Sequence, residues 1–148
     1  MISSFKYIVM KEPEYFPAFS KALLAGALTG MAATLINVIY EVIFRSITNY
    51  EPAAWFNFFS ITFATMIVLT LTGMFFYLFA KSNSFKSYDV VITVIIIAVI
   101  CITAFLHSDK SQAAFYGNHG LVAGFVILSG ILALTLLPYL FRHPKLFL

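Results

Sequence analysis

The sequence predicts an all-α integral membrane protein, an up-down bundle of four transmembrane helices with both termini in the cytoplasm. Hydrophobic residues make up 61% of the chain and charged residues 10%, and the mean hydropathy is +0.95. Soluble domains carry about 25% charged residues, so this chain lacks the side chains for a water-compatible surface. The chain also contains four long apolar runs joined by short connections. A transmembrane β-barrel is disfavoured, because its strands are about 10 residues long with alternating polarity.

The first expected span covers residues 21–45 and has two different faces. On a helix, one sector of roughly 100° carries small and then polar side chains: Ala22, Gly26, Gly30, Ala33, Asn37, Tyr40 and Glu41. The opposite face is apolar throughout. Burying a carboxylate within a membrane is costly, so Glu41 needs either a partner or a purpose.

The other expected spans cover residues 54–80, 89–107 and 114–141. Crossing roughly 30 Å of hydrocarbon takes about 20 helical residues, so the first, second and fourth spans have room to tilt. The third is short, and we expect Asp89 and His107 to lie at its interfacial ends. Residues 1–148 are interpreted as one domain, because the connections leave no room for an extramembrane domain. Short connections also favour antiparallel neighbours.

Cys101 is the only cysteine, and it lies in the middle of the third span. One cysteine excludes an intrachain disulfide and a cysteine-rich metal site. We interpret Cys101 as a small apolar packing residue. No cofactor and no metal are expected.

The distribution of positive charge predicts the orientation in the membrane. Two cationic residues, Arg45 and Lys110, belong to the first and third connections. The tails and the second connection hold seven, namely Lys6, Lys11, Lys21, Lys81, Lys86, Arg142 and Lys145. Lysine and arginine concentrate in cytoplasmic segments, so both termini are expected in the cytoplasm. The net charge of +3 is explained by this topology, and nucleic acid is not an expected partner.

Two GxxxG motifs predict close helix packing. Gly26 and Gly30 form one in the first span, and Gly120 and Gly124 form the other in the fourth. Small residues let helix backbones approach closely in lipid, so we expect the first and fourth spans to pack against each other. A contact between copies of the chain is the alternative interpretation. The second span shows no clear polar or small face.

The up-down topology brings polar residues together at the outer side of the membrane. This candidate site comprises Asn37, Tyr40, Glu41, Arg45, Asn57 and His119. Glu41 and Arg45 are four residues apart and can form a simple ion pair within one helix. In a second interpretation Glu41 faces His119 in a functional pocket, where it either holds the imidazole in its charged form or exchanges a proton with it. A polar contact between subunits is the third.

The layout resembles small four-helix bacterial membrane proteins that form families of unknown function. The matching features are Asn37 near the outer end of the first span and His119 before the small residues of the fourth. The resemblance implies no activity. It implies the bacterial cytoplasmic membrane as the location.

The chain contains no GxSxG, HExxH, Walker or CxxC motif. We therefore expect a non-enzymatic multi-pass protein, either an accessory subunit or a small-ligand binder with its polar cluster at the outer face. Its expected partners are the lipid bilayer, a membrane protein or second copy, and a small apolar or lipid-like ligand. An oligomeric transporter or channel is the alternative. A lipid- or quinone-modifying enzyme with Glu41 and His119 as acid and base is the second alternative.

Overall fold

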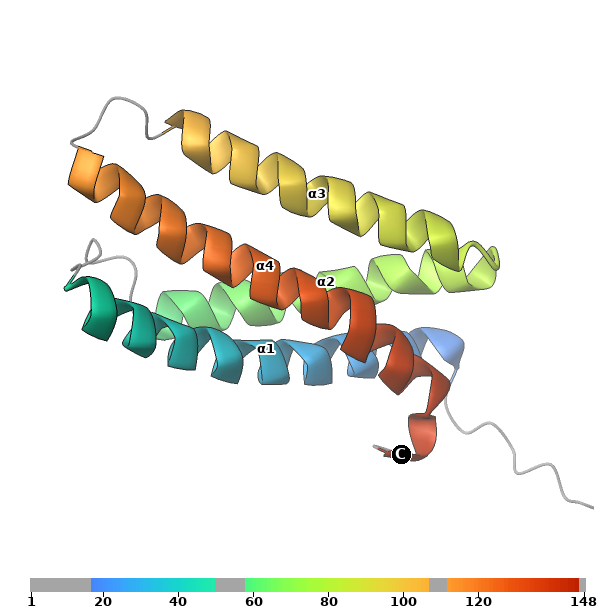
Figure 1. Cartoon of the computed structure of the whole chain (residues 1–148). Helices are drawn as coiled ribbons and strands as arrows, with labels where there is room; N and C mark the ends of the chain where they lie inside the picture. Colours follow the sequence, from blue (N-terminus) through green and yellow to red (C-terminus); the bar gives the residue numbers. More distant parts are fainter. Residues whose placement is uncertain (1–16, 50–57, 107–111, 147–148) are drawn as a thin grey trace, which may run out of the picture.

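The computed structural model describes residues 17–49, 58–106 and 112–146, and its regular elements are helical (Figure 1). The long helices are α1 (Ala18–Thr48), α2 (Phe58–Lys81), α3 (Phe85–Leu106) and α4 (Gln112–Arg142), and the short 3₁₀ helix η1 (Pro144–Leu146) follows. Consecutive long helices run in opposite directions (Figure 1). All four are long and apolar enough to cross a membrane. The expectation of an all-helical protein with four such helices is confirmed.

Local sequence explains where the helices begin and end. Pro17 precedes α1 with a φ of −59°, a value that its ring favours and that suits a helix start. Asn49 ends α1 in the left-handed conformation, and its N–H donates to the carbonyl of Arg45. Asn83 has a φ of 54° in the turn between α2 and α3. Asparagine tolerates this conformation better than most residues, so both helices stop at a suitable side chain.

The closest backbone approach joins α1 to α2 at Gly26 and Gly73. A Cβ added at Gly73 would lie 2.6 Å from the carbonyl oxygen of Ala22 and 2.9 Å from the Gly26 Cα. A Cβ added at Gly26 would lie 2.8 Å from the carbonyl oxygen of Leu69. These separations are too short for any side chain at either position. Glycine is therefore required on both helices for this contact.

This arrangement corrects part of the predicted packing. Gly26 and Gly30 face α2, where Gly30 contacts Met66, and not α4 as the paired motifs suggested. α1 does pack against α4 as well, so it lies between two partners. The second span also has a packing face, contrary to expectation: Ile61, Thr65, Leu69, Gly73 and Phe76 are buried at intervals of three or four residues.

An aromatic cluster joins α2, α3 and α4 near the turn between α2 and α3. Phe76, Tyr88 and Leu137 are its buried members. The Tyr88 hydroxyl donates to the carbonyl oxygen of Ala133 at 2.9 Å, and the Phe76 and Tyr88 rings meet edge to face. Because α4 continues through Pro138 to Arg142, it also carries Phe141 against this cluster.

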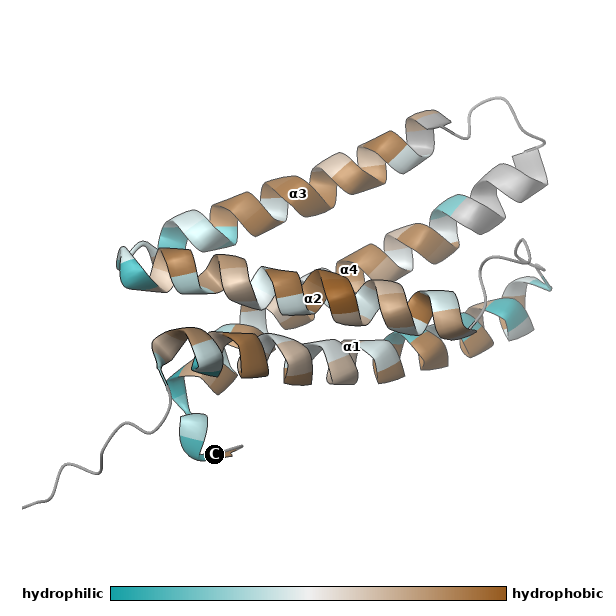
Figure 2. Ribbon diagram, turned by 180° about the vertical axis from the view of Figure 1, so that it is seen from behind, coloured by the Kyte–Doolittle hydropathy of each residue, from teal (hydrophilic) through white to brown (hydrophobic). Residues whose placement is uncertain are grey.

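Most of α3 is exposed, and its outer surface is apolar (Figure 2). Tyr88 is its buried residue among those whose side chains the structure describes. Asp89 is exposed in the second turn of α3, while His107 lies outside the described residues. Cys101 is exposed as well. The expectation that it packs against other parts of the chain is therefore wrong among the described residues. In water such a surface would favour association, whereas lipid solvates it.

Replacing Gly73 by alanine is expected to lower the free energy of unfolding by about 1–3 kcal/mol, because the added methyl group meets backbone that cannot move aside. Gly30→Ala is the matched control. Its added Cβ lies 3.3 Å from Met66 Sδ, the movable part of a side chain. We expect a change below about 1 kcal/mol there, since alanine also favours the helix. Unfolding titrations in detergent measure both variants, and equal losses would contradict the proposed Gly26–Gly73 contact.

Candidate functional site

Asn37 joins three helices from within the bundle. It lies on α1 and is 1% exposed. Its Nδ2 donates to Thr65 Oγ1 on α2 at 3.2 Å and to Ser129 Oγ on α4 at 2.9 Å. We call Asn37, Thr65 and Ser129 the Asn37 cluster. Hydrogen bonds between helices hold polar side chains in an environment where water is absent, so this cluster fixes α1 against both neighbours.

Three buried oxygen atoms near the Asn37 cluster have no hydrogen-bond partner among the described residues. They are Asn37 Oδ1, Thr34 Oγ1 and Thr62 Oγ1. Most helical threonines here behave differently: the Thr29 hydroxyl donates to the Ala25 carbonyl at 2.7 Å, and Thr72 and Thr135 make the same bond to the residue four earlier. Thr34 and Thr62 therefore retain hydrogen-bonding capacity inside the bundle.

Glu41 and Arg45 form an ion pair along α1. The Glu41 residue is 6% exposed, whereas the Arg45 side chain is 44% exposed. The four-residue spacing lets the guanidinium reach back over one helical turn and neutralise the buried carboxylate. This is the first of the three interpretations given for Glu41. An ion pair within one helix lowers the cost of placing Glu41 in hydrocarbon without any partner on another helix.

Tyr40 fills the recess formed by the GxxxG motif of α4. Its hydroxyl donates to the Gly120 carbonyl at 3.0 Å, and its ring packs against the Gly124 Cα so closely that a Cβ there would overlap it. The Phe44 ring covers Gly120 less tightly, since a Cβ there would lie 3.2 Å from it, and Phe125 meets the Tyr40 ring edge to face. The predicted contact between the first and fourth spans is thus present, with aromatic rings of α1 opposite the glycines of α4.

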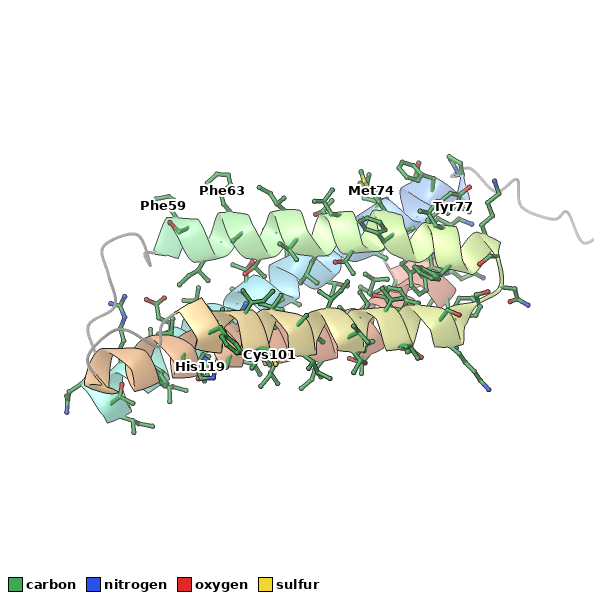
Figure 3. All side chains as sticks on the ribbon, turned by 90° about the horizontal axis from the view of Figure 1, so that it is seen from above. Phe59, Phe63, Met74, Tyr77, Cys101 and His119 are labelled. Atoms are coloured by element: carbon green, nitrogen blue, oxygen red, sulfur yellow. The ribbon has the colours of Figure 1, made fainter. Side chains whose placement is uncertain are left out.

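The remaining predicted site residues are His119 and Asn57. His119 is partly buried on α4, two turns after the helix begins rather than at its start (Figure 3). Asn57 lies outside the described residues. Across residues 17–49, 58–106 and 112–146, His, Cys, Asp and Glu side chains do not gather in threes as a metal site requires.

Sequence reasoning missed Thr65, Ser129 and Gly73. The missed signal was the four-residue spacing of Ile61, Thr65, Leu69 and Gly73, which places Thr65 and Gly73 on the same buried stripe of α2 as two large apolar side chains. A search restricted to glycine pairs passes over Gly73, since it has no glycine four residues away. Ser129 gives no comparable signal, because its importance depends on the position of Asn37 on another helix.

Comparisons of the chain with protein-family models, curated proteins and solved structures find no match. The candidate site is therefore argued from its own geometry.

A double-mutant cycle on Asn37→Ala and Ser129→Ala is expected to give a coupling energy of about 0.6 kcal/mol, the average for hydrogen bonds between membrane helices, and at most about 1.7 kcal/mol. Unfolding titrations of the two single variants and the double variant measure it. Thr135→Ala is the control, because the Thr135 hydroxyl bonds to Ile131 in its own helix. Asn37→Ala and Thr135→Ala should be additive, and additivity of Asn37→Ala with Ser129→Ala would contradict the bond.

Proposed function

We propose that this chain is a non-enzymatic accessory subunit that crosses a bacterial cytoplasmic membrane four times, with both termini on the cytoplasmic side. Four apolar helices support the membrane location. The seven-to-two distribution of lysine and arginine supports the orientation. The polar groups of α1 then belong to the outer half of the bundle.

The observation that carries this proposal is that the polar side chains of α1 bond to groups within the chain itself. Asn37 bonds to α2 and α4, Tyr40 bonds to α4, and Glu41 bonds to Arg45. The bonds of Asn37 and Tyr40 stabilise the contacts between helices, and the bond of Glu41 to Arg45 neutralises its carboxylate. The pairing of Glu41 with Arg45 also weakens the case for proton exchange with His119, on which the enzyme hypothesis depends.

The exposed length of α3 supports an accessory role. Its outer face is rich in β-branched side chains, including Val90, Val94, Ile95, Ile97 and Ile102. β-Branched residues lose little side-chain entropy when they pack, because they are already restricted at χ1. A stiff apolar helix with few contacts inside its own chain suits packing against a helix of another membrane protein.

Small-ligand binding is a second candidate function. The observation in its favour is the set of unpaired buried oxygens, Thr34 Oγ1, Asn37 Oδ1 and Thr62 Oγ1. A lipid-like ligand with a hydroxyl group could donate to Asn37 Oδ1 and accept from a threonine hydroxyl. Such a ligand would combine an apolar body with one polar group, as its surroundings require.

Cysteine labelling tests the orientation. In a Cys101→Ala background, Thr48→Cys and Ser82→Cys place thiols at opposite ends of the bundle, where both positions are exposed. A membrane-impermeant maleimide should label Thr48→Cys in intact cells and should label Ser82→Cys after the membrane is opened. Exclusive labelling of Ser82→Cys in intact cells would contradict the proposed orientation.

Purification from the native membrane in a mild detergent tests the accessory role. The chain should elute in a complex with a second membrane protein, and a photo-crosslinker attached to Cys101 on α3 should join the two. A crosslinker at Phe63→Cys in the Cys101→Ala background, on the exposed face of α2, is the control and should give less product (Figure 3). An isolated monomer, or equal crosslinking from both positions, would count against α3 as the contact surface.

A further inference from the structure

One end of the bundle carries most of the charge of the described residues. The start of α1, the end of α2, the start of α3 and the end of α4 lie together there, followed by η1 (Figures 1 and 2). Its cationic side chains are Lys21, Lys81, Lys86, Arg142 and Lys145, and Asp89 is its one carboxylate among the described residues. We call this set of cationic side chains the basic end. At the opposite end Glu41 and Arg45 neutralise each other.

Most of these cations are available to an external partner. Lys81, Lys86, Arg142 and Lys145 are exposed, and none forms an ion pair with a described carboxylate. Like charges at the ends of α2 and α4 and the start of α3 repel one another, which destabilises the bundle unless anions are bound nearby. The basic end is therefore a surface that gains stability from negative charge.

Arg142 is held in place by an aromatic platform. Its guanidinium carbon lies 5.2 Å from the centre of the Phe85 ring, a cation–π contact between α4 and α3. Phe85 rests on Phe76, which also meets the Phe141 ring at 5.2 Å. Because the guanidinium is already held above an apolar cluster, it loses little conformational freedom when it binds an anion. Its planar array of N–H donors matches the oxygen atoms of a phosphate group.

Aromatic side chains accompany the charges around this end. The Phe19 and Tyr77 rings meet edge to face across α1 and α2, and Tyr139 stacks on His143 at the end of α4. Tyrosines concentrate where a membrane protein passes from hydrocarbon into headgroups. Cations and tyrosines therefore lie together at this end of the bundle, a combination typical of a membrane interface.

We propose that the basic end binds the phosphate groups of anionic phospholipids in the cytoplasmic leaflet, with Lys81, Lys86 and Arg142 as the main contacts. This inference rests on the proposed membrane orientation. Lipid is the partner that the observations favour, because the charges surround the ends of four apolar helices and sit directly above an aromatic layer. Each lysine or arginine near such a surface adds attraction to anionic lipid.

Lipid retention measures this binding. The full chain is reconstituted in vesicles of equal phosphatidylglycerol and phosphatidylcholine, extracted in mild detergent, and its bound lipids are counted by native mass spectrometry. Phosphatidylglycerol should be enriched, and the enrichment should fall as salt is raised. Each of Lys81→Gln, Lys86→Gln and Arg142→Gln should reduce the enrichment by up to about fivefold.

Asp89→Asn is the matched control, since it changes the same end in the opposite electrostatic sense. It should increase the enrichment, and a decrease would overturn the proposal. Equal retention of both lipids by a chain inserted in the vesicles would also overturn it. So would unchanged enrichment in a variant that combines Lys81→Gln, Lys86→Gln and Arg142→Gln. A chain that does not enter the vesicles at all would contradict the proposed membrane function as well.

Discussion

The contact between Gly26 and Gly73 is the constraint on which the rest of the bundle depends. Helices in lipid gain little from hiding apolar side chains, because the surrounding tails are equally apolar, and so they associate through close packing. Glycine on both helices brings the α1 and α2 backbones together, where a Cβ on either residue would lie under 3 Å from the facing backbone. Once α1 is fixed against α2, its other face can receive α4. The position of α1 between two partners follows from this contact.

Polar side chains complete the packing that the glycines begin. Asn37 makes one hydrogen bond to α2 and one to α4, so both bonds form only when the three helices are correctly aligned along their axes. A shift of one residue in either neighbour would leave buried N–H groups without acceptors, at a cost that lipid cannot offset. Tyr40 likewise fixes the position of α4 along α1, because its hydroxyl bonds to Gly120 and its ring packs on Gly124. The polar face of α1 therefore fixes the alignment of α2 and α4 and is also the candidate site.

The four helices were predictable because hydrophobicity and length are properties of each segment alone. The interpretation of Glu41 with Arg45 was predictable for a similar reason, as a four-residue spacing determines a contact within one helix. The pairing of Gly26 with Gly73, and of Asn37 with Ser129, depends on the rotation of one helix against another. No local pattern records that rotation. Cys101 was misjudged for the same reason, because nothing in the third span indicates which side faces its neighbours.

The attachment of α3 at one end has a consequence for how the sequence can drift over evolutionary time. Tyr88 is tied to α4 by its hydroxyl and to Phe76 by its ring, and Ile96 meets Gly130 farther along. The outward positions of α3 are exposed in the part of the chain that the structure describes. Substitutions at those positions must keep the helix soluble in hydrocarbon and compatible with a partner helix, whereas substitutions at Tyr88 must also preserve its hydrogen bond and its ring contact inside the chain. A lineage could therefore rewrite the outer surface of α3, and with it the set of proteins it meets, while leaving the other three helices intact.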